Sequence, residues 1–254
     1  MLSDKEFIRY SRQLMLPDFG DEGQLKLKQS RVVLIGCGGL GHAAAQYIVA
    51  SGIGHLTLVD GDVVERSNLQ RQILFREQDI GANKAKICAG QLKMLNPHCR
   101  IVAIDQHFTE INAEMLLNGC DWLLDCTDNF QSRLLINQLC QQWRISEISA
   151  AAITQQGQLM LWPFAKNQTL NYRTLFADVT DKALNCQSLG VLAPLVGVIG
   201  AMQALMLVQQ ILKPDSQAKF WQFDGVDWRL RNYQLAALDN FQSEPILKVS
   251  QAAE

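Results

Sequence analysis

The sequence predicts an α/β fold in which a mainly parallel sheet is extended by antiparallel strands in the C-terminal half. Short apolar runs alternate with helical segments through residue 150, which is typical of a parallel sheet with crossover helices. The first of these runs are mostly apolar without strict alternation, as strands covered on both faces are. After residue 150 the alternation stops, and strands expected at 157–163 and 220–224 are separated by a long polar loop at 165–188 and an apolar helix. These two strands are therefore expected to pair antiparallel.

The first half of the chain offers its elements in a regular order. A helix is expected at 3–16, because Ser3 and Glu6 have the spacing of a capping box and Phe7, Tyr10 and Leu14 follow at helical spacing. The other expected strands lie at 31–35, 56–60, 101–104, 122–126 and 145–151, and the other helices at 41–51, 81–95, 112–119 and 131–144. Asn96 and Pro97 end the helix that begins after Gly81.

A glycine-rich turn joins the first strand to the helix that follows it. Residues 36–41 read Gly-Cys-Gly-Gly-Leu-Gly, and the next strand ends at Asp60. Free backbone N–H groups and the helix dipole favour an anion at such a turn, and an acid about twenty residues later can accept hydrogen bonds from a ribose. The pattern predicts a Rossmann-like nucleotide site formed by Gly36, Gly38, Gly39, Gly41 and Asp60.

The segment after Asp60 decides between two kinds of nucleotide. Asn68, Arg71, Gln72 and Lys84 follow within a short span, and these side chains are suited to phosphate oxygens. Asp128 follows a neighbouring strand and can hold Mg²⁺. This set favours ATP and phosphoryl or nucleotidyl transfer, which rely on positioning and charge neutralisation. An NAD-dependent oxidoreductase, the alternative from another class, explains the turn and Asp60 but leaves the cations without a role.

Composition limits the partners and the cellular location that can be expected. The formal net charge of −2 points to neither nucleic acid nor an anionic membrane as a partner. Seven scattered cysteines, most of them in apolar runs, favour a reducing compartment, so a cytoplasmic location is expected. The run 189–212 has no charged residue, but Gly190, Pro194 and three glutamines favour a buried helix over a membrane span.

Several motifs occur together and in order. They are Arg9–Gln13 (RYSRQ), the 36–41 turn, Ser67–Gln72 (SNLQRQ), Lys84, Asp125–Asn129 (DCTDN), and the pair GVLAP at 190–194 and GVIG at 197–200. Over residues 1 to about 235 the chain resembles the ThiF/MoeB-type sulfur-carrier adenylyltransferases, relatives of the ubiquitin-activating enzymes. The motifs are specific only in combination, because none of them is diagnostic alone.

The resemblance implies an activity and a set of roles. Members use ATP and Mg²⁺ to adenylate the C-terminal Gly-Gly carboxylate of a small ubiquitin-like sulfur carrier, releasing pyrophosphate. It implies that Asp60 binds the ribose, that Asn68, Arg71 and Lys84 bind phosphates with Gln72 beside them, and that Asp128 is linked to Mg²⁺. Arg12 matches an arginine that reaches the ATP of the other subunit, which implies a homodimer. The catalytic set is therefore expected to be Arg71, Lys84, Asp128, Arg12 and Cys186.

The C-terminal half carries the remaining expectations. The resemblance implies one domain over 1–254, with a nucleotide-binding half at 1–150, a carrier-binding and dimer half at 151–240 and a tail at 241–254. Cys186 matches a family cysteine on a mobile loop, where the thiol joins to the activated carrier, takes part in sulfur transfer, or is inert. A cysteine desulfurase or sulfurtransferase is then an expected partner. Most members hold zinc with two CxxC pairs, but Asn171, Thr174 and the segment 239–242 lack those cysteines, so no structural zinc is expected.

Alternatives remain within and beyond the family. The segments Ile73–Phe75, Phe223–Gly225 and Trp228–Arg229 favour the thiamine branch over the molybdopterin branch. A relative that activates a tRNA base is disfavoured because no added basic region is present. A non-catalytic carrier-binding scaffold is the other alternative, and the intact cation set argues against it.

Overall fold

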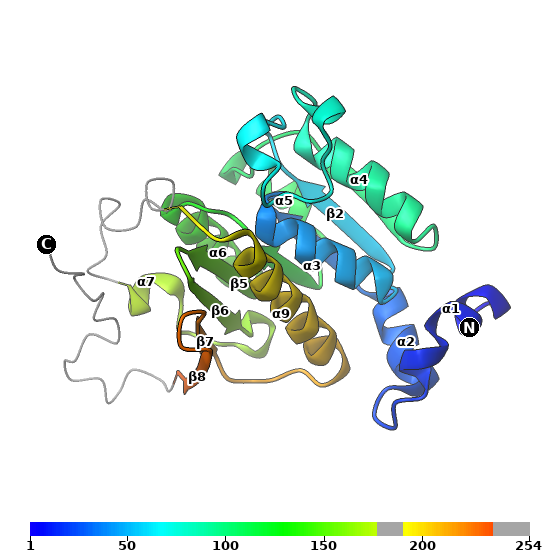
Figure 1. The fold of residues 1–254 in the computed structure, drawn as a ribbon. Helices are drawn as coiled ribbons and strands as arrows, with labels where there is room; N and C mark the ends of the chain where they lie inside the picture. The colour runs from blue at the N-terminus through cyan, green and yellow to red at the C-terminus, as the bar shows by residue number, and fades with distance from the viewer. Residues whose placement is uncertain (177–189, 236–254) are drawn as a thin grey trace, which may run out of the picture.

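The computed structural model describes residues 1–176 and 190–235 (Figure 1). Its helices are α1 (Asp4–Leu14), α2 (Gly20–Gln29), α3 (Gly39–Ala50), α4 (Lys84–Leu95), α5 (Glu110–Leu117), α6 (Phe130–Trp143), α7 (Tyr172–Leu175) and α9 (Ala193–Leu212). Its strands are β1 (Arg31–Ile35), β2 (His55–Val59), β3 (Arg100–Ile104), β4 (Trp122–Asp125), β5 (Ser146–Ile153), β6 (Gln156–Trp162), β7 (Lys219–Asp224) and β8 (Arg229–Gln234). The expected elements of the first half are thus confirmed, with small shifts at their ends.

The strands form one sheet in the order β3-β2-β1-β4-β5-β6-β7-β8. Neighbours from β3 through β5 pair parallel, whereas β6, β7 and β8 are added antiparallel. The predicted mixed sheet is therefore confirmed. The chain runs from β1 out to β3 on one side and resumes with β4 on the other side of β1. In sheets of this kind the crevice at such a switch point, beyond the carboxyl ends of the strands, is where ligands bind.

Helices cover both faces of the sheet (Figure 1). One core cluster joins the sheet to α3, α4 and α9, and includes Leu34, Ile48, Leu92 and Leu207. A second cluster on the other face joins it to α5 and α6, and includes Leu123 and Leu139. Because β1 and β4 are covered on both faces, their side chains are apolar in both directions, which explains the continuous apolar runs of the sequence.

Local signals set several helix ends as expected. Ser3 and Glu6 form the predicted capping box of α1: Ser3 N–H donates to the Glu6 carboxylate at 2.9 Å, and Glu6 N–H donates to Ser3 Oγ at 3.4 Å. Asn83 caps α4 by accepting a hydrogen bond from Lys86 N–H at 3.1 Å. These caps satisfy backbone donors that a helix leaves free in its first turn.

The structure differs from the sequence-based expectation at three elements. We did not expect α2, which contains two glycines and has no side-chain cap at its N-terminus. The strand β8 was missed because its sequence, Arg-Leu-Arg-Asn-Tyr-Gln, has the polarity of an edge strand. The helix α7 interrupts the start of the long polar loop expected at 165–188. Residues 177–188 of that loop, which include Cys186, and the expected tail lie outside the described residues.

The apolar helix α9 lies within the fold. By length and composition its 20 residues would suffice to cross a membrane, with a mean hydropathy of 1.8. Half of that stretch is buried within the structure, where Ile199 and Leu207 contribute to the same core as α3. Leu192, just before the helix, and Val198 and Leu205 on it remain exposed. The helix thus has one face in the core and one apolar face outward.

Candidate active site

A cavity of about 840 Å³ lies at the carboxyl ends of β1, β2 and β4. Three polar segments line it: the glycine turn, the loop after Asp60 and the segment 127–129. The structure therefore brings together, around one space, nine of the residues singled out in the sequence: Gly36, Gly38, Gly39, Asp60, Asn68, Arg71, Gln72, Lys84 and Asp128. Residues 63–75, which carry Asn68, Arg71 and Gln72, are called the anion loop below.

Two other predicted residues lie elsewhere, and a third is not described. Gly41 is beneath the turn and does not line the cavity. Arg12 is exposed on α1, away from the cavity of its own chain. Cys186 falls outside the described residues.

Close packing explains two of the glycines. Gly36 has a φ of +94°, and a Cβ there would lie 2.8 Å from the Cys126 carbonyl oxygen at the end of β4. A Cβ on Gly41 would lie 2.1 Å from the Gly36 carbonyl oxygen, which no side chain can do. The turn is therefore pressed against β4 and α3 at once. No side chain caps the N-terminus of α3, so its dipole faces the cavity and favours an anion there.

Asp60 is held in place by backbone donors. Its two carboxylate oxygens accept the N–H groups of Cys37 at 2.7 Å and Asp62 at 2.8 Å. Burial raises the pKa of Asp60, and the two N–H donors and the Lys84 ammonium oppose that rise. A carboxylate has about four acceptor sites, so Asp60 retains capacity for two hydroxyl donors such as those of a ribose.

The anion loop presents donors toward the cavity. Asn68 is buried, and its Oδ1 accepts from Glu65 N–H at 3.0 Å, which leaves its NH₂ group as the end that can meet an anion. The Arg71 guanidinium donates to the Ser67 carbonyl at 3.2 Å and forms no ion pair with any described residue. Gln72 is buried, and its Oε1 has no hydrogen-bond partner in the described part of the chain. The loop therefore has unused polar capacity next to the glycine turn.

Lys84 is the first residue of α4 and lines the cavity together with Asp62. Its ammonium lies 2.9 Å from Asp62 Oδ2, and its side chain is only 10% exposed. Asp62 was not among the residues expected from the sequence. It could have been found, because Asp62 follows the ribose-type acid by only two residues, at the end of the same strand.

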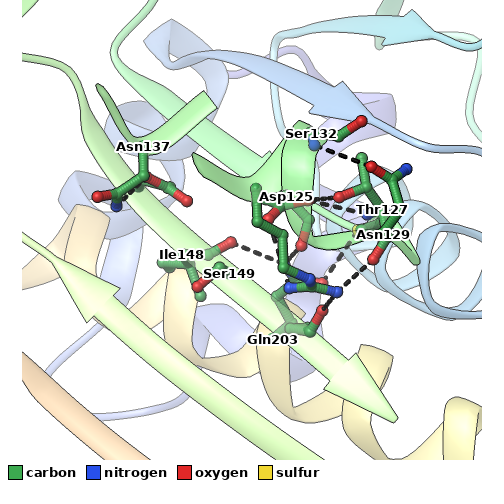
Figure 2. Close-up of polar contacts among 12 residues, drawn as sticks. Asp125, Thr127, Asn129, Ser132, Asn137, Ile148, Ser149 and Gln203 are labelled. Carbon is green, nitrogen blue, oxygen red and sulfur yellow. Dashed lines mark hydrogen bonds and ion pairs between the residues drawn. The ribbon is translucent and has the colours of Figure 1, made fainter. Parts of the chain in front are cut away.

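Beneath the cavity, at the end of β4, lies a polar network of Asp125, Thr127, Arg133 and Gln203, which is called the floor below. Thr127 and Arg133 line the cavity, and Asp125 and Gln203 are fully buried behind them. Asp125 is fully buried, and its Oδ1 accepts from Thr127 N–H at 2.8 Å and Thr127 Oγ1 at 2.6 Å. Its Oδ2 lies 3.4 Å from Arg133, whose guanidinium also donates to the Thr127 and Ala150 carbonyls. Figure 2 shows Asp125, Thr127 and Gln203 converging at this point.

Gln203 on α9 ties the floor to the neighbouring strand. Its amide donates to the Asp125 carbonyl at 3.1 Å and the Ile148 carbonyl at 2.8 Å, and its Oε1 accepts from Cys126 Sγ at 3.1 Å (Figure 2). Sequence reasoning missed Arg133 and Gln203. Arg133 reads as one more polar residue of a helix, and Gln203 as one polar residue in an apolar run, so only the fold shows their common target.

Asp128 projects from the segment above this floor. It is exposed, and no hydrogen bond or ion pair ties it to the described residues. Among the residues described, no three His, Cys, Asp or Glu side chains cluster as a metal site. Mg²⁺ at nucleotide sites commonly uses one or two carboxylates together with substrate phosphates, so a single free carboxylate fits that mode.

Comparisons with known proteins agree on one family. A model of the ThiF family matches residues 10–244. The molybdopterin-synthase adenylyltransferases of Salmonella typhimurium and Escherichia coli are each 38% identical, over 92% of this chain and 94% of their own length. The adenylyltransferase and sulfurtransferase MOCS3 of Drosophila persimilis is 41% identical over 92% of this chain. This chain spans about half, 52%, of that relative.

Solved structures share the fold. PaaA has a TM-score of 0.78 at 22% identity, covering 92% of this chain and 84% of its own. E. coli MccB, solved with ATP, has a TM-score of 0.73 at 26% identity, covering 89% and 71% respectively.

Proposed function

Because this chain belongs to the ThiF family, we propose that it is an ATP-dependent adenylyltransferase acting on the C-terminal carboxylate of a small sulfur-carrier protein. One observation carries the proposal: a single cavity joins a helix N-terminus and a ribose-type acid to the cations Arg71 and Lys84. An NAD-dependent oxidoreductase would need the first two features and has no need of the cations. The names of the curated relatives support the same chemistry.

The residues present fit ATP and Mg²⁺. The glycine turn is close-packed at Gly36, Gly39 and Gly41, and Gln72 lies beside it with a side-chain amide that can donate to a phosphate. In our proposal Asp60 holds the ribose, and the N-terminus of α3 together with Asn68, Arg71 and Lys84 holds the phosphates. Mg²⁺ at Asp128 would neutralise charge on the phosphates.

The chemistry then needs positioning rather than a protein nucleophile. A carboxylate oxygen of the carrier forms a bond to the α-phosphorus while the bond to pyrophosphate breaks. Arg71 and Lys84 stabilise the charge that passes to the leaving group, and the cavity aligns the two reactants. Lys84 is already aligned by Asp62, whose carboxylate takes up one of its three donors.

The identity of the carrier is a finer question. Three segments of the sequence favour the thiamine branch, whereas the curated relatives above are a molybdopterin-synthase adenylyltransferase and MOCS3. The relatives match over nearly the whole chain, and the segments are three short runs. We therefore propose a carrier of the molybdopterin-synthase type first and one of the thiamine type second. The name of MOCS3 includes a sulfurtransferase, which supports a sulfur-donating partner of the same kind.

We also propose that the protein is a homodimer in which each active site receives Arg12 from the other chain. Arg12 lies outside its own cavity, so a role at the nucleotide requires a second chain. Exposed apolar side chains on α1 and α9, namely Phe7, Ile8, Val198 and Leu205, supply the surface that a dimer would cover.

The absence of zinc remains a prediction of the sequence. At the place of the first CxxC pair, Asn171 and Thr174 form a reciprocal capping box at the start of α7. Such a cap organises this turn by hydrogen bonds. Elemental analysis of the purified protein checks the prediction, and one tightly bound zinc per chain would contradict it.

ATP–pyrophosphate exchange tests the proposed function. We expect exchange that depends on Mg²⁺ and on a carrier ending in Gly-Gly, with the molybdopterin-type carrier giving the faster rate. Arg12→Ala should abolish exchange while Lys5→Ala, on the same helix, leaves it near the wild-type rate. A carrier truncated by its last two glycines serves as the negative control. NAD binding without exchange on any carrier would overturn the proposal.

A further inference from the structure

A fully buried imidazole lies behind the cavity wall. His42 is on α3, one helical turn beyond Gly39, and has no exposed surface. Its ring meets the anion loop at Leu74 and Phe75 and meets α4 at Cys88. None of these contacts is explained by the catalytic roles assigned above.

The hydrogen bonds of His42 indicate its tautomer. Leu74 N–H donates to Nδ1 at 3.1 Å, so Nδ1 must carry a lone pair. The ring proton of the neutral imidazole is then on Nε2, which lies 3.2 Å from Cys88 Sγ and donates to it. The Phe75 ring packs edge-on against the imidazole, with centroids 4.4 Å apart at 82°. His42 therefore holds the loop by one hydrogen bond and one aromatic contact.

The contact between His42 and Leu74 is matched by a second contact between α3 and the loop, at the glycine turn. A Cβ on Gly39 would lie 3.3 Å from the Arg71 carbonyl oxygen, so the loop touches the glycine turn at Arg71. Three residues later on both segments, His42 holds Leu74. Residues three apart share one face of a helix. The loop thus runs along a single face of α3. It contacts the glycine turn at Arg71 and is hydrogen-bonded to His42 at Leu74.

The other hydrogen bonds of the loop run within it or to residues 76–82, and none of those in the described structure reaches α3. The N–H groups of Arg71 and Gln72 bond to the Asn68 carbonyl, and Phe75 N–H bonds to the Gln72 carbonyl. These bonds give the loop its shape but do not attach it to α3. The bond from Leu74 to His42 is what relates that shape to the glycine turn.

We propose that His42 is a positioning residue that sets Asn68, Arg71 and Gln72 opposite the glycine turn through its Nδ1 acceptor. The inference rests on the proposed function, because it takes these side chains to bind the phosphates of ATP. The nucleoside end of the site, at Asp60, is held by Cys37 and Asp62 and is independent of this anchor.

The contact with Cys88 is a separate interaction. Burial raises the pKa of the Cys88 thiol, but hydrogen bonds from Cys37 and His42 outweigh that effect and lower it to about 6. Cys88 lies one turn after Lys84 on α4. Its loss should leave the bond between His42 and Leu74 in place, which makes Cys88→Ala a control for the other side of the ring.

Two matched substitutions separate the functions of the ring. In His42→Asn the side-chain oxygen can occupy the place of Nδ1 and keep the acceptor for Leu74. In His42→Gln the side-chain amide can reach the place of Nε2 and keep the donor to Cys88, but the acceptor is lost. We expect His42→Gln to weaken ATP binding about tenfold, the effect of one hydrogen bond. His42→Asn and Cys88→Ala should stay within about twofold of wild type.

Titration calorimetry with ATP, and competition of adenosine against ATP, give the required readouts. Adenosine affinity should be equal in all four proteins, because adenosine has no phosphates. Equal ATP affinities in the Asn and Gln variants would overturn the proposal, as would a parallel loss of adenosine and ATP binding in the Gln variant. If wild-type protein binds no ATP, the proposed function fails and this inference with it, whereas normal wild-type binding isolates the test to His42.

Discussion

The floor of the cavity and the anion loop each bury one glutamine, and the two are treated differently. Gln203 uses its amide hydrogens on two carbonyls and its oxygen on a thiol. Gln72 is also buried, yet its oxygen has no partner among the described residues. The same side chain is thus structural in one region and unsatisfied in the other.

The difference extends to the charged residues. In the floor, Arg133 is paired with Asp125 and bonds to two carbonyls. In the anion loop, Arg71 has one carbonyl and no carboxylate in the described part of the chain. Buried polar groups are stable only when satisfied, so the floor is completed by the protein itself and the loop is arranged for completion by a ligand. Stability should therefore depend on the floor, and binding on the loop.

The largest test of this contrast compares an arginine from each region. Arg133→Met leaves Asp125 buried without its cation, and breaking a buried pair in this way costs about 3–5 kcal/mol. Arg66→Met removes an exposed partner of Glu77, where both side chains are mostly in water, and should cost less than about 1 kcal/mol. Urea unfolding curves measure both. Similar losses in the two variants would remove the distinction between floor and loop.

Arg71→Ala should show the reverse pattern. It removes a cation that has no carboxylate partner in the described structure, so the free energy of unfolding should change by less than about 0.5 kcal/mol. Pyrophosphate exchange should fall about 10²–10³-fold, as for other preorganised donors to transition-state charge. Arg71→Lys keeps the charge but not the fork of donors and should recover only part of the rate. A full recovery would reduce the role of Arg71 to a point charge.

A buried carboxyl beside the floor sharpens the comparison through pH. Glu147 on β5 is fully buried, with Oε2 bonded to Asn137 and Oε1 without a partner among the described residues. Burial, and then the charge of Asp125, raise the pKa of Glu147 well above its ordinary 4.5. The folded chain therefore keeps a proton that the unfolded chain releases above pH 4.5. Stability from this group is complete below that pH and is lost as pH rises toward the folded pKa.

Glu147→Gln removes this titration and keeps the shape of the side chain. We expect the free energy of unfolding of the variant, relative to wild type, to rise by about 1.4 kcal/mol for each pH unit above 4.5, until the folded carboxyl ionises. Urea unfolding curves of both proteins at pH 5, 6 and 7 measure this difference in free energy. The other titrating groups are the same in both proteins, so their contributions cancel. A difference that stays constant with pH would mean that Glu147 is ionised in the folded protein.

The sequence predicted the loop better than the floor, for a physical reason. Anion-binding side chains follow one another along the chain at Asn68, Arg71 and Gln72, and local spacing is enough to recognise them. The floor is assembled from β4, α6 and α9, and Gln203 is 78 residues from the Asp125 carbonyl that it binds. Such a pairing has no local signal, since only the order of strands in the sheet brings the two together.

The same reason applies to the elements that were missed. The expected strands β1 to β7 are apolar or follow the strand–helix alternation, and all were found. The strand β8 lies at the sheet edge and pairs only with β7, from Lys219 opposite Gln234 to Asp224 opposite Arg229. It forms because β7 offers it a pairing edge, which the sequence of β8 does not reveal. His42 reads in the sequence as one polar residue in an apolar helix, and its function depends on a loop that begins twenty-one residues later.

The smallest predicted effects compare the two glutamines directly. Gln203→Met leaves the Asp125 and Ile148 carbonyls without this donor and should lower the free energy of unfolding by about 1–3 kcal/mol. Gln72→Met replaces a buried group whose oxygen has no partner in the described structure, so stability should hold or rise slightly, while ATP binding weakens because the amide donor is lost. Urea unfolding and ATP titration on both variants give a two-by-two comparison. If Gln72→Met lost as much stability as Gln203→Met, the unsatisfied oxygen would have to be bonded in the folded protein, and the loop would be as self-contained as the floor.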